Sequence, residues 1–246
     1  MAANKPRHLQ PLAAATLTSS RLRGALYRWS AMKSSGVLLI TMGIFTFLSS
    51  TSEAAVEDDF WKWFKKNQEM IFHFENDTER TFDKLSDALS KVDPELTFEF
   101  SPILENGKRE FVISAGGIKS AFPSVEKLAN SAPDLEKWTI VKFRPRRLPL
   151  NDLNYGGVSV RADDVYYNLY KDGEKPGVVL FFDEYNEEQH TVYGNMAYLF
   201  LDEALGEYDV ETKLGFIEFH RKSSEHSKNA KQLKHLASQV DEYFSE

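Results

Sequence analysis

Residues 96–115, LTFEFSPILENGKREFVISA, decide the fold of this chain. Apolar and polar residues alternate in both arms of the stretch, so that Phe98 in the first arm and Phe111 in the second mark one face. Between the arms, Asn106-Gly107 favours a type I′ turn, because both residue types tolerate positive φ angles. The stretch therefore predicts a β-hairpin with one buried face.

The same order of elements is expected twice along the chain. After the hairpin, Pro123 opens a predicted helix, and residues 138–143 have the pattern of a third strand. A second series of two strands, a helix and a strand is predicted at residues 165–170, 177–182, 195–205 and 211–219. We therefore predict an α+β fold with an antiparallel or mixed sheet, built from two β-β-α-β halves over residues 95–144 and 157–220.

Helices are predicted on both sides of these halves. Apolar residues recur at spacings of three and four from Phe60 to Val92, which predicts two N-terminal helices. A C-terminal helix is expected over residues 227–244. We interpret residues 55–246 as a single α+β domain, with two fused halves as the alternative, and the proline-containing run FRPRRLPL at 143–150 as their connector.

Residues 1–54 are predicted to be a targeting segment. The stretch 36–48 carries no charge and is too short to span a hydrocarbon core of about 30 Å as a helix, a length that suits a signal-peptide core. A start at Met32 would place a lysine before it, and small residues stand three and one positions before a cleavage site preceding Ala55. A signal peptide over 32–54 is therefore our preferred interpretation.

Two questions stay open for this segment. Residues 36–48 could instead form an uncleaved membrane anchor or an ordinary core helix, and only a retained segment would bring the chain to a membrane. Residues 1–31, rich in Arg, Ser and Ala and free of acid, fit an extension upstream of the true start or an organellar transit segment. The expected location is periplasmic or secreted, with a membrane-anchored or organellar protein as the alternative.

Charge and cysteine content exclude several classes of function. The net charge of −7 is uneven, because six of the 30 basic residues and none of the 37 acidic ones fall in residues 1–52. The remaining chain has 24 basic against 37 acidic residues, a net of −13, so we expect it not to bind nucleic acid, whose recognition depends on Lys and Arg. The absence of cysteine excludes a disulfide scaffold, a thiolate zinc site and a cysteine nucleophile.

No catalytic template matches the sequence, so no catalytic residue, metal ligand or cofactor is assigned and an enzyme is not favoured. Residues 157–161 lack the last glycine of a nucleophile elbow, residues 116–120 lack the first part of a phosphate loop, and no HExxH occurs. Gly116-Gly117, between a strand and a helix, is interpreted as a turn, and the alternative hypothesis is that its amides hold an anion. The permissive φ of glycine is sufficient to explain the turn.

Two clusters of opposite charge are the candidate binding residues. The basic cluster lies at residues 142–147 and the acidic one at 202–211. We predict that they pair with each other, or that the arginines bind an anionic ligand or partner, since Arg forks suit carboxylate and phosphate. The alternatives are a charged sheet edge that discourages aggregation and a solvated helix end. The candidate ligand-binding residues are Arg144, Arg146, Asp202, Glu203, Glu207, Tyr208 and Asp209.

Four blocks, FWKWF at 60–64, FVISAGGIK at 111–119, KFRPR at 142–146 and LDEALGEYDVET at 201–212, resemble an uncharacterised family of bacterial proteins with a domain of unknown function. The resemblance covers about residues 57–220. It implies a compact α+β domain whose distinctive residues include the seven candidates above, and it implies no catalytic residue. A leading export segment is not a feature of that family.

The expected function is an exported, non-enzymatic module that binds a protein partner or a small ligand where the two charge clusters meet. One alternative is a metal-dependent hydrolase that uses the acidic block at 202–211, through Asp202, Glu203 and Glu207. Its shell would be completed by Asp163, Asp164 or His190. The other alternative is a membrane-tethered structural protein that keeps residues 36–48.

Overall fold

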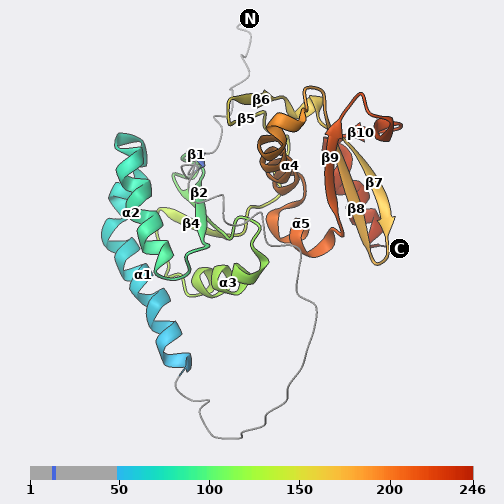
Figure 1. Ribbon diagram of the computed structural model, residues 1–246. Coiled ribbons are helices and arrows are strands. Elements are labelled where there is room, and N and C mark those ends of the chain that lie inside the picture. The colour runs from blue at the N-terminus through green and yellow to red at the C-terminus, as the bar shows by residue number, and fades with distance from the viewer. Residues whose placement is uncertain (1–12, 15–48, 246) are drawn as a thin grey trace, which may run out of the picture.

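The computed structural model describes residues 13–14 and 49–245 (Figure 1). The predictions about Met32 and residues 36–48 therefore lie outside the described residues. The first helix, α1, begins at Ser49 and so includes the position at which cleavage before Ala55 is predicted.

Two four-stranded sheets carry the fold (Figure 1). The first has the order β1-β2-β3-β4, with strands Ala13–Ala14, Thr97–Phe100, Arg109–Ser114 and Trp138–Lys142. The second has the order β10-β7-β8-β9, with strands Lys231–Gln232, Tyr166–Asp172, Lys175–Phe182 and Ile217–Arg221. A separate two-stranded ribbon, β5 at Leu153–Tyr155 and β6 at Val158–Val160, was not predicted and follows the connector.

Both sheets have the same internal topology, which confirms the predicted α+β fold of two β-β-α-β halves. Each contains an antiparallel hairpin, β2-β3 or β7-β8, whose second strand pairs in parallel with a later strand, β4 or β9. Parallel pairing requires a crossover. It is α3 in the first half and α4 with α5 in the second, at Phe122–Asn130, His190–Leu205 and Glu207–Lys213. We refer to β2-β3-α3-β4 as the first half and to β7-β8-α4-α5-β9 as the second.

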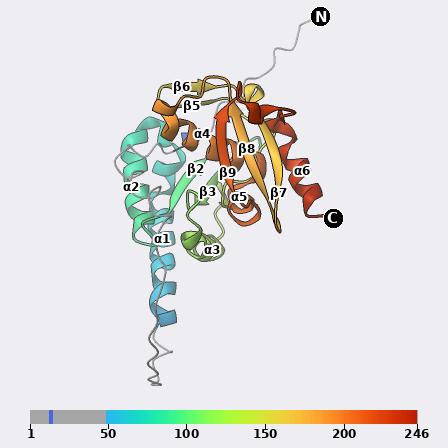
Figure 2. The ribbon, with the colours of Figure 1, turned by 45° about the vertical axis from the view of Figure 1, so that its right-hand side comes forward.

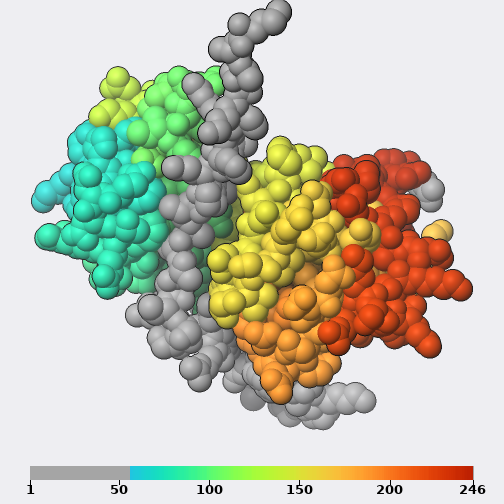
Figure 3. Space-filling model, turned by 90° about the horizontal axis from the view of Figure 1, so that it is seen from above, coloured from blue at the N-terminus to red at the C-terminus, as the bar shows by residue number. Residues whose placement is uncertain are grey.

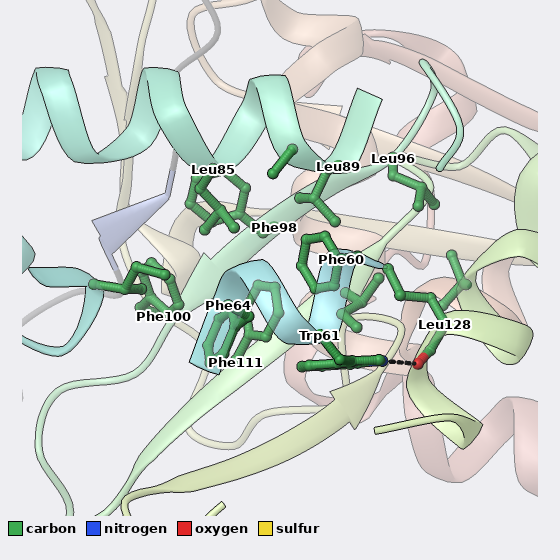
Figure 4. Close-up of a cluster of buried hydrophobic side chains, with 14 of the residues drawn as sticks. Phe60, Trp61, Phe64, Leu85, Leu89, Leu96, Phe98, Phe100, Phe111 and Leu128 are labelled. Atoms are coloured by element: carbon green, nitrogen blue, oxygen red, sulfur yellow. Dashed lines mark hydrogen bonds between the residues drawn. The ribbon is translucent and has the colours of Figure 1, made fainter. Parts of the chain in front are cut away.

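The first half is covered by the N-terminal helices α1, Ser49–Phe72, and α2, Thr78–Ser90 (Figures 1 and 4). Phe98, Phe100 and Phe111 lie on one sheet face as predicted and join the helices in an aromatic core. Trp61 of α1 donates its indole N–H to the carbonyl of Leu128 in α3 at 2.9 Å, which ties the helices together (Figure 4). The burial of these large rings is the main stabilisation of this half.

The second half has its own core, built from its sheet, α4 and the C-terminal helix α6, Leu236–Tyr243. Tyr193, Met196 and Phe200 of α4 and Leu236 and Val240 of α6 are buried in it. In Figure 3 the N-terminal helices and the first half, cyan to yellow-green, lie on the opposite side of the molecule from the second half and the C-terminal helix, gold to red.

Two predicted elements near the C-terminus were wrong in extent. Residues 211–213 belong to α5 and not to a strand, because Gly206, with a φ of 84°, ends α4 and lets a new helix begin at Glu207. The C-terminal helix begins at Leu236 rather than at residue 227. Before it, Asn229 has a φ of 65° and residues 231–232 pair with β7, so these residues are not helical, and a short 3₁₀ helix at Leu233–His235 leads into α6.

Candidate functional site

The candidate residues meet between the two halves, around Arg144 of the connector. Arg144 Nε donates to Glu99 Oε1 of β2 at 2.5 Å, and Nη1 donates to Asp202 Oδ2 of α4 at 3.0 Å. Both carboxylates are buried. One guanidinium therefore bonds an acid from each half. The junction network, as we call it, consists of four residues: Arg144, Glu99, Asp202 and Glu207.

Burial and charge oppose each other in this network. Burial disfavours the charged form of Arg144, but Glu99, Asp202 and Glu207 outweigh it and raise the pKa of the guanidinium. Burial raises the pKa of the Asp202 carboxyl to about 7, and Arg144 only partly offsets this. Three carboxylates share one cation, so Asp202 holds a proton over much of the acidic to neutral range.

Glu207, at the start of α5, is fully buried and accepts three backbone hydrogen bonds. Its Oε1 accepts from the amides of Ala115 at 2.9 Å and Gly117 at 3.1 Å, and its Oε2 accepts from the amide of Arg144 at 3.1 Å. The hypothesised anion site in the Gly116-Gly117 turn is thus occupied by a carboxylate of the same chain. Both glycines have positive φ angles, 59° and 80°, but only the amide of Gly117 points at Glu207, because that of Gly116 donates to Ser114 Oγ at 2.9 Å.

Gly206 allows the acidic block to lie against the connector. The amide of Glu207 donates to the carbonyl of Arg144 at 2.9 Å, and a Cβ at Gly206 would lie 3.3 Å from that oxygen. With its φ of 84°, this glycine permits both the break between α4 and α5 and the close approach of the backbones. The LDEALGEYD pattern is therefore a helix-glycine-helix turn fitted to the connector.

Arg146 forms a second group of contacts nearer the surface. Its Nε donates to the carbonyl of Leu205 at 2.8 Å, and its Nη atoms donate to Asp209 at 2.8 Å and to Asp241 of α6 at 2.7 Å. The bond to Arg146 lowers the pKa of Asp241. Because about a third of the arginine side chain is exposed, these pairs are weaker than those of the junction network.

Glu203 holds the connector at two points. Its carboxylate accepts from the backbone and side-chain amides of Asn151, at 2.8 and 3.1 Å, and its carbonyl accepts from the amide of Arg147 at 2.8 Å. Burial raises the pKa of the Glu203 carboxyl, which the Asn151 bonds oppose. These bonds fix the chain on both sides of Leu148-Pro149-Leu150.

Tyr208 and Lys142 complete the comparison with the predicted site. The Tyr208 ring contacts Phe122 and Phe143, with centroids 5.7 and 5.3 Å apart, and is 46% exposed. Lys142 of the basic cluster takes no part in these contacts, and its amine donates to Asn130 of α3. β4 ends at Lys142 and Phe143 has a φ of 60°, so the chain leaves the strand before it reaches Arg144.

The predicted pairing of the basic and acidic clusters is therefore confirmed, with Arg144 and Arg146 as its cations. A ligand at these residues stays a prediction. The carboxylates of the hydrolase hypothesis have separate partners: Asp202 bonds Arg144, Glu203 bonds Asn151 and Glu207 bonds backbone amides. No cluster of three or more His, Asp or Glu placed to hold a metal ion occurs within residues 13–14 and 49–245.

Sequence reasoning missed Glu99, Asn151 and Asp241 as members of these contacts. Alternation correctly put Glu99 on the face opposite the aromatic core, but nothing local indicated that the second half covers this face. Asn151 and Asp241 lie far along the chain from their partners, and no periodic signal marked them.

Comparison with protein-family models, with curated proteins and with solved structures found no match. The resemblance to an uncharacterised bacterial family therefore stays a prediction. Among the helices of the described ranges, none combines the length and apolar character needed to cross a membrane.

Proposed function

We propose that this protein is an exported, non-enzymatic module that binds another protein through its connector. The observation that carries the proposal is Leu148, an apolar side chain that is 66% exposed beside a hollow of about 550 Å³. Exposed apolar surface that is rimmed by polar residues marks protein interaction sites.

The lining of this connector hollow has the composition of an interface. Its apolar part includes Leu148, Pro149 and Leu150, and its polar part includes Lys234 and His235. An apolar centre with a polar rim is the usual arrangement at protein interfaces. A small ligand is normally enclosed over most of its surface. The strong exposure of Leu148 instead favours a partner large enough to cover it.

The charged residues support this function by positioning the connector. Glu203 bonds Arg147 and Asn151, the residues on either side of the Leu148-Pro149-Leu150 segment. A loop held at both ends loses less conformational entropy when a partner binds, which favours affinity. In this proposal the two charge clusters orient the binding surface, and the apolar connector makes the contact.

The test begins with a photo-crosslinking residue at position 148, and in a matched control at Ile103, which is 51% exposed in the β2–β3 loop. Each full chain is expressed in its own source cells. A partner crosslinked at 148 is purified, and its affinity is measured for wild type, Leu148→Asp and Ile103→Asp. We expect at least a tenfold loss for Leu148→Asp, about 1.4 kcal/mol, and no change for Ile103→Asp.

Two outcomes would overturn the proposal. One is a crosslink pattern that is the same at both positions, and the other is a partner that binds Leu148→Asp as tightly as wild type. Circular dichroism and urea unfolding of both variants distinguish a lost contact from a lost fold.

A further inference from the structure

The outer edge of β7 is only partly paired. On one side β7 pairs with β8 along its whole length, from Tyr166 to Asp172. On the other side β10 pairs with Tyr166 and Tyr167 alone. From residue 168 to 172 this edge has no strand partner within the described part of the chain.

The backbone groups that point outward can be assigned from two contacts. The amide of Leu233 donates to the carbonyl of Val165, which places the outward groups of β7 on odd-numbered residues. The amide of Val178 donates to Phe216, on the β9 side, so the neighbouring residues of β8 face the even-numbered residues of β7. Period-two alternation then directs the N–H and C=O of Leu169 and Lys171 away from β8.

A hollow of about 260 Å³ runs along this edge. Leu169, Tyr170 and Lys171 of β7 form one wall, Lys231 lies at the end where β10 begins, and Tyr243 of α6 lies beside them. Figure 2 shows α6 next to β7, at the edge of the sheet. We call this the edge hollow.

The charge of the edge hollow differs from that of the rest of the protein. Two lysines, Lys171 and Lys231, line it, and no carboxylate does. Residues 53–246 as a whole carry a net charge of −13. A basic groove on an acidic protein selects for an acidic partner.

We infer that the edge hollow binds an extended acidic segment of the partner protein, which adds to the second sheet as a strand beside β7 and continues the line of β10. Unpaired strand edges bind extended segments in this way, with backbone bonds supplying affinity and side chains supplying specificity. The inference rests on the proposed partner-binding function and identifies the part of the partner that is recognised.

The side chains of β7 define the segment further. Residues directly opposite each other share a face, so an acidic residue opposite Lys171 would form a cross-strand ion pair. Opposite Tyr170, which is 39% exposed and lies 6.4 Å from the Phe216 ring, an apolar residue would extend the aromatic contact. We therefore expect an acidic residue and an apolar residue at adjacent positions of the segment.

One short stretch of the chain, residues 229–235, contributes to the lining of both hollows. The edge hollow is lined by Asn229 and Lys231, and the connector hollow by Gln232, Lys234 and His235. A partner bound beside β7 therefore has the connector hollow within a few residues of the same stretch.

The experiment uses the full chain and a phage-displayed library of random ten-residue peptides as the probe. Selected peptides are synthesised, and their affinities are measured for wild type and four variants. Leu169→Pro removes one outward N–H but leaves the β8 ladder intact, whereas Leu169→Ala keeps the N–H. Lys171→Glu reverses the charge of the groove, and Lys84→Glu, exposed on α2, is its control.

We expect acidic peptides that bind Leu169→Pro at least tenfold more weakly than wild type and Leu169→Ala within about threefold. Lys171→Glu should weaken binding by about three- to tenfold and Lys84→Glu should not. Bound peptide should slow hydrogen exchange at the amides of Leu169 and Lys171. If Leu169→Pro fails to fold, the exchange pattern and Lys171→Glu still decide the outcome.

Peptides without acidic residues, equal affinity for Leu169→Pro, or protection elsewhere in the chain would overturn the inference. So would a dimer that pairs two β7 edges, seen by light scattering and lost in Leu169→Pro. If Leu148→Asp still disrupts partner binding while no peptide occupies the edge, this inference fails and the proposed function stands. If acidic peptides bind at β7 but no crosslink forms at position 148, the edge hollow binds such segments and the proposed contact through Leu148 fails.

Discussion

The two halves share a topology but differ at the carboxyl ends of their parallel strands. In each half the residue after the last strand donates its amide back to the hairpin, Phe143 to Ile113 at 2.8 Å and Lys222 to Phe182 at 2.9 Å. In the first half the adjoining amides bond the buried Glu207. At this end of the first half, the backbone amides are therefore covered by a carboxylate of the second half.

In the second half this end is a partly exposed surface. Lys222 pairs with Asp183 at 3.3 Å and lies 3.9 Å from the centre of the Tyr166 ring. Its side chain is 32% exposed and that of Asp183 53%. The difference shows that the same end of a β-β-α-β unit can be a buried binding site for a carboxylate, as in the first half, or part of the protein surface, as in the second.

The largest expected effect tests this contrast directly. Glu207→Ala leaves three inward amides without their acceptor and should destabilise the protein by about 3 to 5 kcal/mol. Asp183→Ala, at the equivalent end of the second half, removes an exposed pair and should cost less than about 1 kcal/mol. Urea unfolding of both variants gives the two free energies. Equal losses would mean that burial by the other half does not distinguish the two ends.

The second prediction concerns pH at the junction. The pKa of Asp202 is about 7 in the folded protein and about 4 when unfolded, so the folded state holds an extra proton between these values. The stability contributed by this proton is fully present below pH 4 and is lost as pH rises through 7. Relative to Asp202→Asn, wild type should lose about 2 to 3 kcal/mol between pH 5 and pH 8.

Unfolding in urea at pH 5, 6, 7 and 8 measures this difference for both proteins. Asp183→Asn is the matched control from the exposed end of the second half. A constant difference between wild type and Asp202→Asn across the four pH values would contradict the assignment of the proton to the junction.

Much of the fold could be predicted because its signals are local. Alternation of apolar residues predicted both hairpins, but the type I′ turn predicted at Asn106-Gly107 was wrong, because Gly107 has a positive φ and Asn106 does not. Failures came where long-range contacts decide: Lys231 pairs with β7, although its local sequence fits the start of the predicted helix.

The junction could be predicted only in part. Opposite charges at 142–147 and 202–211 were sufficient to predict pairing, because the Arg fork suits a carboxylate. The sequence did not indicate whether the pairs are exposed or buried. Arg144 also bonds the buried Glu99 of the first half, and the second half covers this residue. The orientation of β7 and its open edge likewise required the complete sheet.

The smallest expected effect comes from two glycine turns, one beside the buried Glu207 and one in the exposed β7–β8 hairpin. Gly117 and Gly173 have φ angles of 80° and 63°, so alanine should cost about 1 kcal/mol at either through backbone strain alone. At Gly117 a Cβ would also lie 3.3 Å from Glu211 Oε1, whereas at Gly173 nothing lies within 4 Å. We therefore expect the free energy of unfolding to fall by about 2 kcal/mol in Gly117→Ala and by about 1 kcal/mol in Gly173→Ala, measured by urea unfolding.

The double variant Gly117→Ala, Glu207→Ala should lose less free energy of unfolding than the sum of the two single losses, since both changes disturb the same amides. Full additivity would indicate that the turn and the Glu207 carboxylate stabilise the protein independently, and that they do not form one coupled site at the end of the first half.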